Sequence, residues 1–329
     1  PPTNVHLPVI LFTCNYYLTD VTEVEHGSTE TIPGSHLFGA NATEMSKSPE
    51  WENYKNQIRP NLGKAGSVTI FNNQVWHRGG PNNNNGTWGI GRTGFGEPVA
   101  ALVDFFYAPL LKDRDCFATE FLNDMMWTAS KRHGSVGMAA FAQSAIDLAL
   151  WDLKGKLLKQ PVYRLLGGPS RDKVKCYCTS DDLDWSIELG FEAFKITNPV
   201  HYSQGLEGVG IMEEKVANAR ETIGKNAELM INPVMAYDVE FAIRLAERLR
   251  PYELRWMEEP LPPEDLESHI QLRKAIPYMP IATGEDHHTR IPFRQLVENR
   301  CVDVVQPDLH WCGGLTEAIK IYHIAEAAG

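Results

Sequence analysis

The feature that most constrains the fold is an alternation of short apolar runs with amphipathic helical patterns, which begins near Lys173. Between the runs, apolar residues recur at the spacing of one helix face, and Pro251 ends one such pattern. This alternation is typical of β/α units that build a parallel sheet. Six strands are predicted, at Val174–Cys178, Ala193–Thr197, Glu228–Ile231, Leu254–Met257, Pro280–Thr283 and Asp303–Gln306.

Polar residues appear where most of these strands should end. In a parallel barrel the carboxyl ends of the strands meet at one mouth, so such side chains are expected to surround one pocket. A single strand-end acid has an ordinary alternative as a helix N-cap or a solvated loop charge. Recurrence once per β/α unit instead favours a shared site. The residues are Lys195, Asn232, Glu258, Glu285 and Asp308.

Oxygen-bearing side chains that meet at one point suit a hard cation such as Mg²⁺, which keeps open positions for substrate oxygens. A metal placed there can stabilise the enediolate that forms when a base removes the proton alpha to a carboxylate. The candidate chemistry is therefore enolisation of a carboxylic acid.

Several motifs in this region resemble the enolase superfamily, and within it the acid-sugar dehydratases of the L-rhamnonate dehydratase type. The resemblance extends from about Gly89 to Gly329. The motifs are SAIDLALWDLKGKLLKQPVYRLLGG, RWMEEPLPPED, ATGEDHH and VVQPDLHWCGGLTEA.

The resemblance implies Mg²⁺ ligands at Asn232, Glu258 and Glu285, with a sugar acid as substrate. It also implies that Lys195 lies near the substrate carboxylate and that Asp308 orients a catalytic histidine. Where the family has an aspartate, this chain has Asn232, so the site is expected to hold Mg²⁺ less tightly. A turn asparagine before Pro233 is the alternative for that position.

The paired histidine of the family lies on strand seven, and this sequence stops at Gly329 after the sixth helix. We therefore expect an α/β fold with an incomplete (β/α)-barrel and impaired or no catalysis. Four other histidines are candidates to replace the missing one, although a structural or surface role is the alternative for each. They are His201, His287, His288 and His310.

The region from Ala101 to Gly168 reads as mostly helical, as implied for the helical part of a capping domain. Its large apolar side chains are predicted to pack in a core rather than to contact substrate. We expect a partial capping region at 87–168 and a partial barrel at 169–329. The packing residues are Trp127, Phe141, Ile146, Leu150 and Trp151.

The pattern of residues 1–86 instead predicts β-strands, at Val9–Tyr17 and Ser67–Phe71. NYYLTDVTEVEHGSTETIPGSHLFG and GSVTIFNNQVWHRGGPNNNNG resemble the phytanoyl-CoA dioxygenase family, which implies a β-rich fragment of a double-stranded β-helix. The asparagine run 82–85 precedes the seam between the two resemblances and suits a turn.

Enzymes of that second family bind Fe(II) through two histidines and a carboxylate, which leaves one face of the metal open for oxygen and 2-oxoglutarate. His77 matches the distal histidine, whereas His6 is followed by Leu and Pro instead of an x-Asp pair. We therefore expect His77 to be a vestigial ligand with a structural role, His36 to brace a loop, and neither iron nor 2-oxoglutarate to bind. An iron and 2-oxoglutarate dioxygenase and a non-catalytic fusion protein remain the alternative functions.

Composition limits the partners. The net charge is −11 and the sequence has no block of basic residues, which argues against nucleic acid as a partner. No apolar run approaches the roughly 18 residues of a membrane span, so a cytoplasmic protein without a membrane partner is expected. The six cysteines show no CxxC spacing, and Cys176 and Cys178 are predicted to pack as small hydrophobes on one strand face. Open sheet edges favour a homo-oligomer or aggregation.

Overall fold

The computed structural model describes most of the chain from residue 87 onward and parts of the segment before it. The chain forms two compact units. The first unit holds the described residues up to Pro169 together with Leu309–Ile319, and the second unit holds Ser170–Asp308 together with Lys320–Gly329. The described residues are 12–16, 29–31, 51, 54, 56–61, 68–72, 77–79, 87–112 and 114–329.

The second unit is built on a parallel sheet. Its six described strands lie in the order β12-β11-β10-β9-β8-β7, and every neighbouring pair is parallel. This confirms the predicted α/β fold with an incomplete (β/α)-barrel. The strands are β7 (Cys178–Thr179), β8 (Ala193–Thr197), β9 (Glu228–Asn232), β10 (Trp256–Glu258), β11 (Ile281–Thr283) and β12 (Val304–Val305).

The first predicted strand is wrong in its placement, because β7 begins only at Cys178. Cys178 and Thr179 pair with Phe194 and Lys195, whereas the preceding residues make no ladder. Val174 is 71% exposed and Cys176 is exposed, so the predicted packing of Cys176 is also wrong. The residues before Cys178 lie outside the ladder at the edge of the described sheet, and residues 173–177 are exposed.

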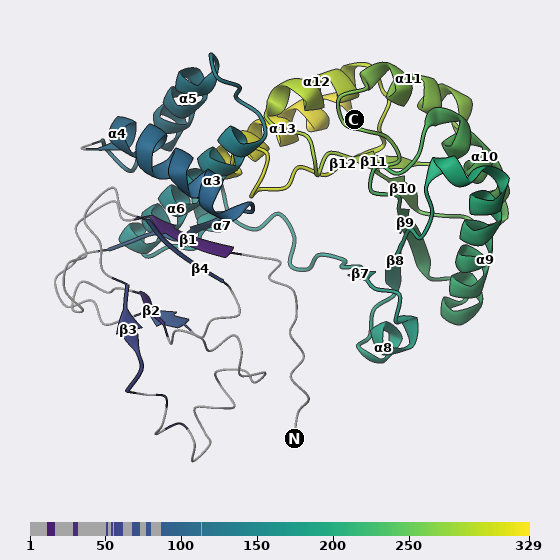
Figure 1. Ribbon diagram of the computed structural model, residues 1–329, viewed down its shortest axis with the longest axis horizontal. Helices are drawn as coiled ribbons and strands as arrows, with labels where there is room; N and C mark the ends of the chain where they lie inside the picture. Colours follow the sequence, from purple (N-terminus) through teal and green to yellow (C-terminus); the bar gives the residue numbers. More distant parts are fainter. Residues whose placement is uncertain are drawn as a thin grey trace. The chain divides into compact units, whose positions relative to one another are not determined.

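Helices follow the strands and cover one face of the sheet, as the green and yellow ribbons show (Figure 1). Three of them start at an aspartate whose side chain accepts a backbone N–H, as N-cap residues do: Asp182, Asp238 and Asp265. The helical elements are α8 (Leu183–Glu188), η3 (Tyr202–Gln204), α9 (Gly205–Ile223), α10 (Val239–Leu249), η4 (Arg250–Tyr252), α11 (Leu266–Ala275), α12 (Arg290–Glu298) and α13 (Leu315–Ala328), the last of which begins in the first unit.

Alternate residues of the strands face opposite sides of the sheet, and both sides are buried. Leu229 and Ile231 of β9 belong to the large core that the helices share. Met230 between them belongs to a smaller cluster with Ala193, Trp256 and Ala282. This second side is the one that a closed barrel would enclose.

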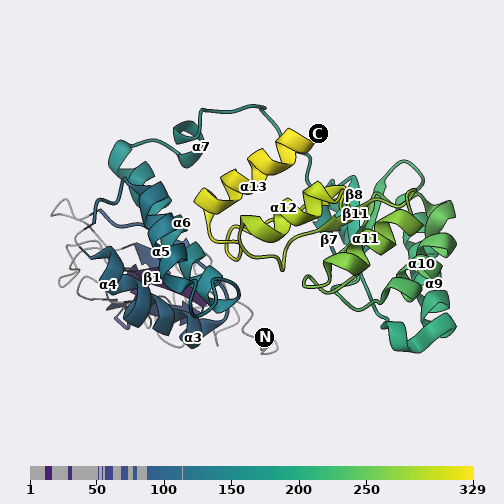
Figure 2. The same cartoon turned by 90° about the horizontal axis from the view of Figure 1, so that it is seen from above.

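The first unit contains a bundle of helices packed around one apolar cluster. Figure 2 shows α6 beside α5, and Val99, Tyr107, Met126 and Ile146 are among the buried residues between these elements. The predicted packing roles of Phe141, Leu150 and Trp151 are confirmed, since each is at most 7% exposed. The elements are α3 (Gly96–Ala101), η2 (Leu102–Tyr107), α4 (Ala108–Leu111), α5 (Thr119–Ser130), α6 (Met138–Leu158) and α7 (Val162–Leu165).

Two small antiparallel sheets complete the described part of the first unit. One has the order β4-β1-β6 and the other the order β3-β2-β5, which agrees with the β-rich front predicted from the sequence. The asparagine run and His36 lie outside the described residues. The strands are β1 (Phe12–Tyr16), β2 (Thr29–Thr31), β3 (Arg59–Pro60), β4 (Val68–Asn72), β5 (His77–Gly79) and β6 (Gly91–Arg92).

Strand β1 joins segments from both sides of the sequence seam. It pairs with β4 on one edge and with β6 on the other, where Cys14 lies opposite Gly91. Strand β6 in turn lies against α6 so closely that a Cβ on Gly91 would stand 1.6 Å from the carbonyl oxygen of Ala145. Glycine is therefore required at this position for the strand to reach the helix.

The loop before α13 and the first turn of that helix are held against α6 by buried polar contacts. The Oδ2 atom of Asp147 accepts the Thr316 N–H at 2.9 Å, and Ser144 Oγ accepts the Gly313 N–H at 2.9 Å. Trp151 Nε1 donates to Thr316 Oγ1 at 2.8 Å. The residues of the WCGGLT and SAIDLALW motifs thus contact one another directly.

None of the helices described here has the length and apolar character needed to cross a membrane. Cys116, Cys176, Cys178, Cys301 and Cys312 are free thiols.

Gly314 lies at the tightest point of the contact between the loop and α6. Its φ is +92°, and an added Cβ would stand 2.5 Å from the Cβ of Asp147. We expect Gly314→Ala to lower the free energy of unfolding by about 2 kcal/mol or more, measured by urea denaturation. Gly210→Ala is the control, because Gly210 lies inside α9 with no atom within 4 Å of an added Cβ, and it should stabilise by roughly 0.5–1 kcal/mol. Equal effects of the two substitutions would contradict the close contact.

Two buried histidines give the second unit a pH-dependent stability. His269 and His287 are 0% and 3% exposed, with ring centroids 6.2 Å apart, and burial lowers the pKa of both. For His287 the pKa falls from 6.5 to about 4, with the neighbouring His269 and His288 as further causes. Between pH 6.5 and about 4, His287 is protonated in the unfolded chain and neutral in the folded protein. The free energy of unfolding therefore falls as the pH is lowered from 6.5 towards 4.

Replacing His287 should reduce this loss. We expect His287→Gln, which keeps an N–H donor and does not titrate, to shrink the fall in unfolding free energy between pH 7.5 and pH 5 by about 2 kcal/mol. Urea denaturation at the two pH values measures this difference. An unchanged fall in His287→Gln would show that His287 is charged in the folded protein.

Candidate active site

Strand periodicity brings four polar side chains to the inner side of the sheet in the second unit. Ala193, Met230 and Trp256 face that side, and the residue two positions later on each strand must face it too. Those residues are Lys195, Asn232 and Glu258, each near the carboxyl end of its strand. Val304 of β12 also packs on that side, and Gln306 lies two residues after it, just beyond the end of the strand.

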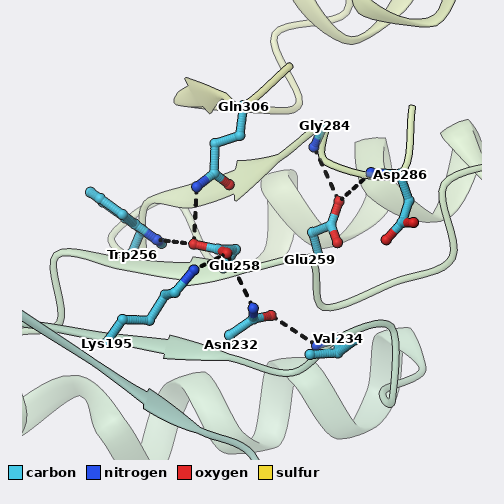
Figure 3. A network of polar contacts seen from close by, with 9 residues as sticks. All are labelled: Lys195, Asn232, Val234, Trp256, Glu258, Glu259, Gly284, Asp286 and Gln306. Atoms are coloured by element: carbon cyan, nitrogen blue, oxygen red, sulfur yellow. Dashed lines mark hydrogen bonds and ion pairs between the residues drawn. The ribbon is translucent and has the colours of Figure 1, made fainter. Parts of the chain in front are cut away.

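Glu258 is the centre of this group and is 1% exposed. Its Oε1 atom accepts from Lys195 Nζ at 2.5 Å and from Asn232 Nδ2 at 3.2 Å. Its Oε2 atom accepts from Trp256 Nε1 at 2.9 Å and from Gln306 Nε2 at 3.0 Å. Figure 3 shows these donors arranged around the carboxylate. One buried anion therefore receives four N–H donors from four different strands or strand ends.

Lys195 supplies the positive charge in this arrangement and is 7% exposed. Burial acts to lower the pKa of Lys195, but the hydrogen bond and charge of Glu258 outweigh it, so the pKa is raised overall. The ammonium also lies 5.2 Å from the centroid of the Tyr177 ring. Lys195 is therefore a buried cation, and Glu258 keeps it protonated.

Glu285 and Asp308 lie near the same group. Burial raises the pKa of Glu285, and Lys195 acts in the opposite direction. The charges of Glu258 and Asp308 add to the rise, which places both carboxylates within electrostatic reach of Glu285. The structure thus joins Lys195, Asn232 and Glu258 by direct hydrogen bonds. Glu285 lies on the loop after β11 and Asp308 on the loop after β12, and their places in the site stay predictions.

The donor chemistry of Glu258, Glu285 and Asn232 fits Mg²⁺, since two carboxylates and an amide can supply three oxygens. Their present contacts show what a cation must displace. Asn232 turns its nitrogen to Glu258, and its Oδ1 accepts the Val234 N–H at 3.0 Å. Within the described residues, His, Cys, Asp and Glu side chains alone form no group of three that could hold a metal. The amide of Asn232 would therefore have to turn to provide the third oxygen.

Sequence reasoning missed Trp256 and Gln306, both of which hold Glu258. A signal was present, because each lies two residues before a predicted site residue and so on the same face. It also missed Glu259, which is 2% exposed and accepts the N–H groups of Gly284 and Asp286. Burial raises the pKa of Glu259 to about 7, and the charge of Asp286 adds to it.

The other candidate histidines have different surroundings. His201 is exposed, and its ring accepts the Ser203 N–H as a helix cap, which agrees with a structural role. His287 packs against His269 and Phe293 in the interior. His288 is half-buried, and burial lowers its pKa. The carbonyl oxygen of His310 accepts from Thr93 in the first unit.

Few of the residues considered as iron ligands lie among the residues that the structure describes. His77 begins β5, and its backbone lies opposite Thr31 of β2. The side chain of His77 and the whole of His6 lie outside the described residues, so the vestigial iron role stays a prediction.

Models of three protein families match the chain. The mandelate racemase / muconate lactonizing enzyme N-terminal domain matches residues 84–167, and the enolase C-terminal domain-like family matches residues 182–329. The phytanoyl-CoA dioxygenase family matches residues 3–88.

Individual proteins show the same similarity. An L-rhamnonate dehydratase of Saccharopolyspora erythraea is 42% identical over 245 residues, which are 74% of this chain and 63% of that protein. The chain thus spans less than two thirds of that relative. The crystal structure of rhamnonate dehydratase from Gibberella zeae complexed with Mg matches with a TM-score of 0.69 at 27% identity, over 97% of this chain and 75% of that one. A racemase from Streptomyces coelicolor with bound magnesium matches with a TM-score of 0.69 at 30% identity, over 77% of this chain and 78% of that one.

The strand order, the phase of the polar strand-end residues and these similarities agree with one another. Through residues 84–329, the chain belongs to the mandelate racemase and muconate lactonizing enzyme group of the enolase superfamily, and it carries a phytanoyl-CoA dioxygenase match ahead of that region.

Proposed function

We propose that residues 84–329 carry the substrate site of an acid-sugar dehydratase that takes an aldonate resembling L-rhamnonate. The observation that carries this proposal is the meeting of Lys195, Asn232 and Glu258 at the ends of three adjacent parallel strands. The similarity to the L-rhamnonate dehydratase of Saccharopolyspora erythraea supports the choice of substrate class.

Glu258, Glu285 and Asn232 would hold Mg²⁺ in this site. Bound there, the metal would polarise the carboxylate of the substrate and stabilise the negative charge of its enediolate. That the two structural relatives contain magnesium supports this assignment.

The chain's own side chains perform the remaining tasks. The ammonium of Lys195 attracts the substrate carboxylate, and its burial strengthens that attraction. Trp256 and Gln306 fix the orientation of Glu258 through its Oε2 atom. Both donors are neutral, so they can hold the carboxylate of Glu258 without repelling a cation that binds to it.

The overall reaction is the loss of water from the sugar acid. A base removes the proton alpha to the carboxylate, the C–O bond at the beta carbon breaks, and the hydroxyl leaves with a proton as water. The resulting enol tautomerises to a 2-keto-3-deoxy acid.

The first test is direct binding of magnesium. We expect millimolar Mg²⁺ to raise the thermal midpoint of the chain, because a ligand that binds only the folded form stabilises it by mass action. Glu258→Gln should abolish this shift. Each variant is compared with its own midpoint without metal, since Glu258→Gln also leaves Lys195 without its ion pair.

The control for this experiment is Glu240→Gln. Glu240 is an exposed residue of α10 that pairs with Arg244, so its loss should leave the magnesium shift unchanged. A shift that survives in Glu258→Gln, or none in the unaltered chain, would count against the proposed ligand set.

The second test concerns the sugar acid. We expect L-rhamnonate to bind in the presence of Mg²⁺, and Lys195→Met to weaken its binding by about tenfold or more through loss of a charge-assisted hydrogen bond. Isothermal titration calorimetry measures both affinities. Release of a 2-keto-3-deoxy acid in the same mixture reports turnover.

Rhamnitol, the sugar alcohol that lacks the carboxylate, is the matched control ligand and should not bind. Equal affinity for L-rhamnonate and rhamnitol would contradict recognition through Lys195. Release of a 2-keto-3-deoxy acid from L-rhamnonate would support the proposed reaction.

A further inference from the structure

We propose that Lys195 is a displaceable counter-ion for Glu258, so that magnesium enters only as the ammonium leaves, and the released ammonium then becomes available to the substrate carboxylate. This inference deepens the proposed function and rests on its metal site. It predicts an order of binding, with the metal first and the acid second.

The first argument is the charge on Glu258. Among the four described donors to this carboxylate, Lys195 alone is charged, whereas Asn232, Trp256 and Gln306 are neutral. A buried carboxylate is unfavourable without a cation beside it. The site must therefore hold either the ammonium or a metal ion.

The second argument is that the two cations need the same atom. Lys195 Nζ lies 2.5 Å from Oε1 of Glu258, and the amide of Asn232, the other proposed ligand, is hydrogen-bonded to that same oxygen. A divalent ion between Asn232 and Glu258 would lie next to the ammonium, and the two positive charges would repel each other in a poorly solvated site. Joint occupancy of Oε1 is therefore unfavourable.

The third argument is that Lys195 has other partners when it leaves. Its side chain is a flexible chain of four methylenes, its ammonium lies 5.2 Å from the centroid of the Tyr177 ring, and Glu285 is within electrostatic reach. Once Glu258 is neutralised by a metal, the carboxylate of a substrate is a suitable new partner for Lys195. Displacement of the Lys195 ammonium thus makes a positive charge available to the carboxylate of the substrate.

The first experiment measures the reactivity of Lys195 in the unaltered chain. The chain is treated briefly with an amine-acylating reagent, with and without saturating Mg²⁺, and the modified lysines are quantified by peptide mass spectrometry. We expect labelling of Lys195 to rise about fivefold or more with Mg²⁺ as the ion pair opens. Lys156, which pairs with Asp152 in α6 of the first unit, is the internal control and should not change.

The second experiment removes the competitor. Lys195→Met keeps the length and apolar stem of the side chain without its charge, and we expect it to bind Mg²⁺ about tenfold more tightly than the unaltered chain, measured by calorimetry. Lys156→Met makes the same change in α6 of the first unit, where Lys156 pairs with Asp152, so its affinity for Mg²⁺ should change by less than about twofold. If Lys195→Met does not fold, the labelling experiment decides alone.

The outcomes separate this inference from the proposed function. Magnesium binding by the unaltered chain, with unchanged Lys195 labelling and no gain in Lys195→Met, would overturn the displacement and leave the metal site intact. Magnesium binding by both proteins, tighter in Lys195→Met and accompanied by increased Lys195 labelling in the unaltered chain, would support the displacement. No binding by either protein would overturn the metal site, and the displacement with it.

Discussion

A carboxylate buried at the end of a parallel strand needs a positive charge beside it, and the site of the second unit is organised around that need. Glu258 is almost fully buried and receives donors from several neighbouring strands. Removing one partner of such a pair is costly because the other charge is left buried. The requirement explains why Lys195 is in the interior, why its pKa is raised despite burial, and why the same oxygen is the natural place for a metal.

The first unit has its own constraint, which is close packing onto helix α6. Strand β6 reaches the helix only because Gly91 has no side chain, and Gly314 meets Asp147 in the same way from the loop that follows Asp308. Because β1 pairs with β6, residues from the front of the chain share a sheet with residues beyond the asparagine run. The boundary between two family resemblances in the sequence is therefore not a boundary between separate sheets in the structure.

Much of the second unit was predictable because its sequence pattern is local. Apolar runs of strand length separated by amphipathic helical patterns specify β/α units, and β8 was predicted with the bounds that the structure has. The placement of Cys176 was not predictable in this way, since an exposed edge residue and a buried one look alike in a short apolar run. The donors Trp256 and Gln306 were missed for a different reason, because their role depends on the strands that lie beside them.

The sequence by itself determined the class of the fold, the order of the strands along the chain and the strand ends that carry polar groups, because these depend on residue periodicity over one β/α unit. Only the tertiary structure decided which atoms meet. That Asn232 presents its nitrogen, and that Lys195 occupies the oxygen a metal would need, follows from the spacing and stagger of adjacent parallel strands. Those quantities are set by packing across the sheet, and no local pattern in the chain encodes them.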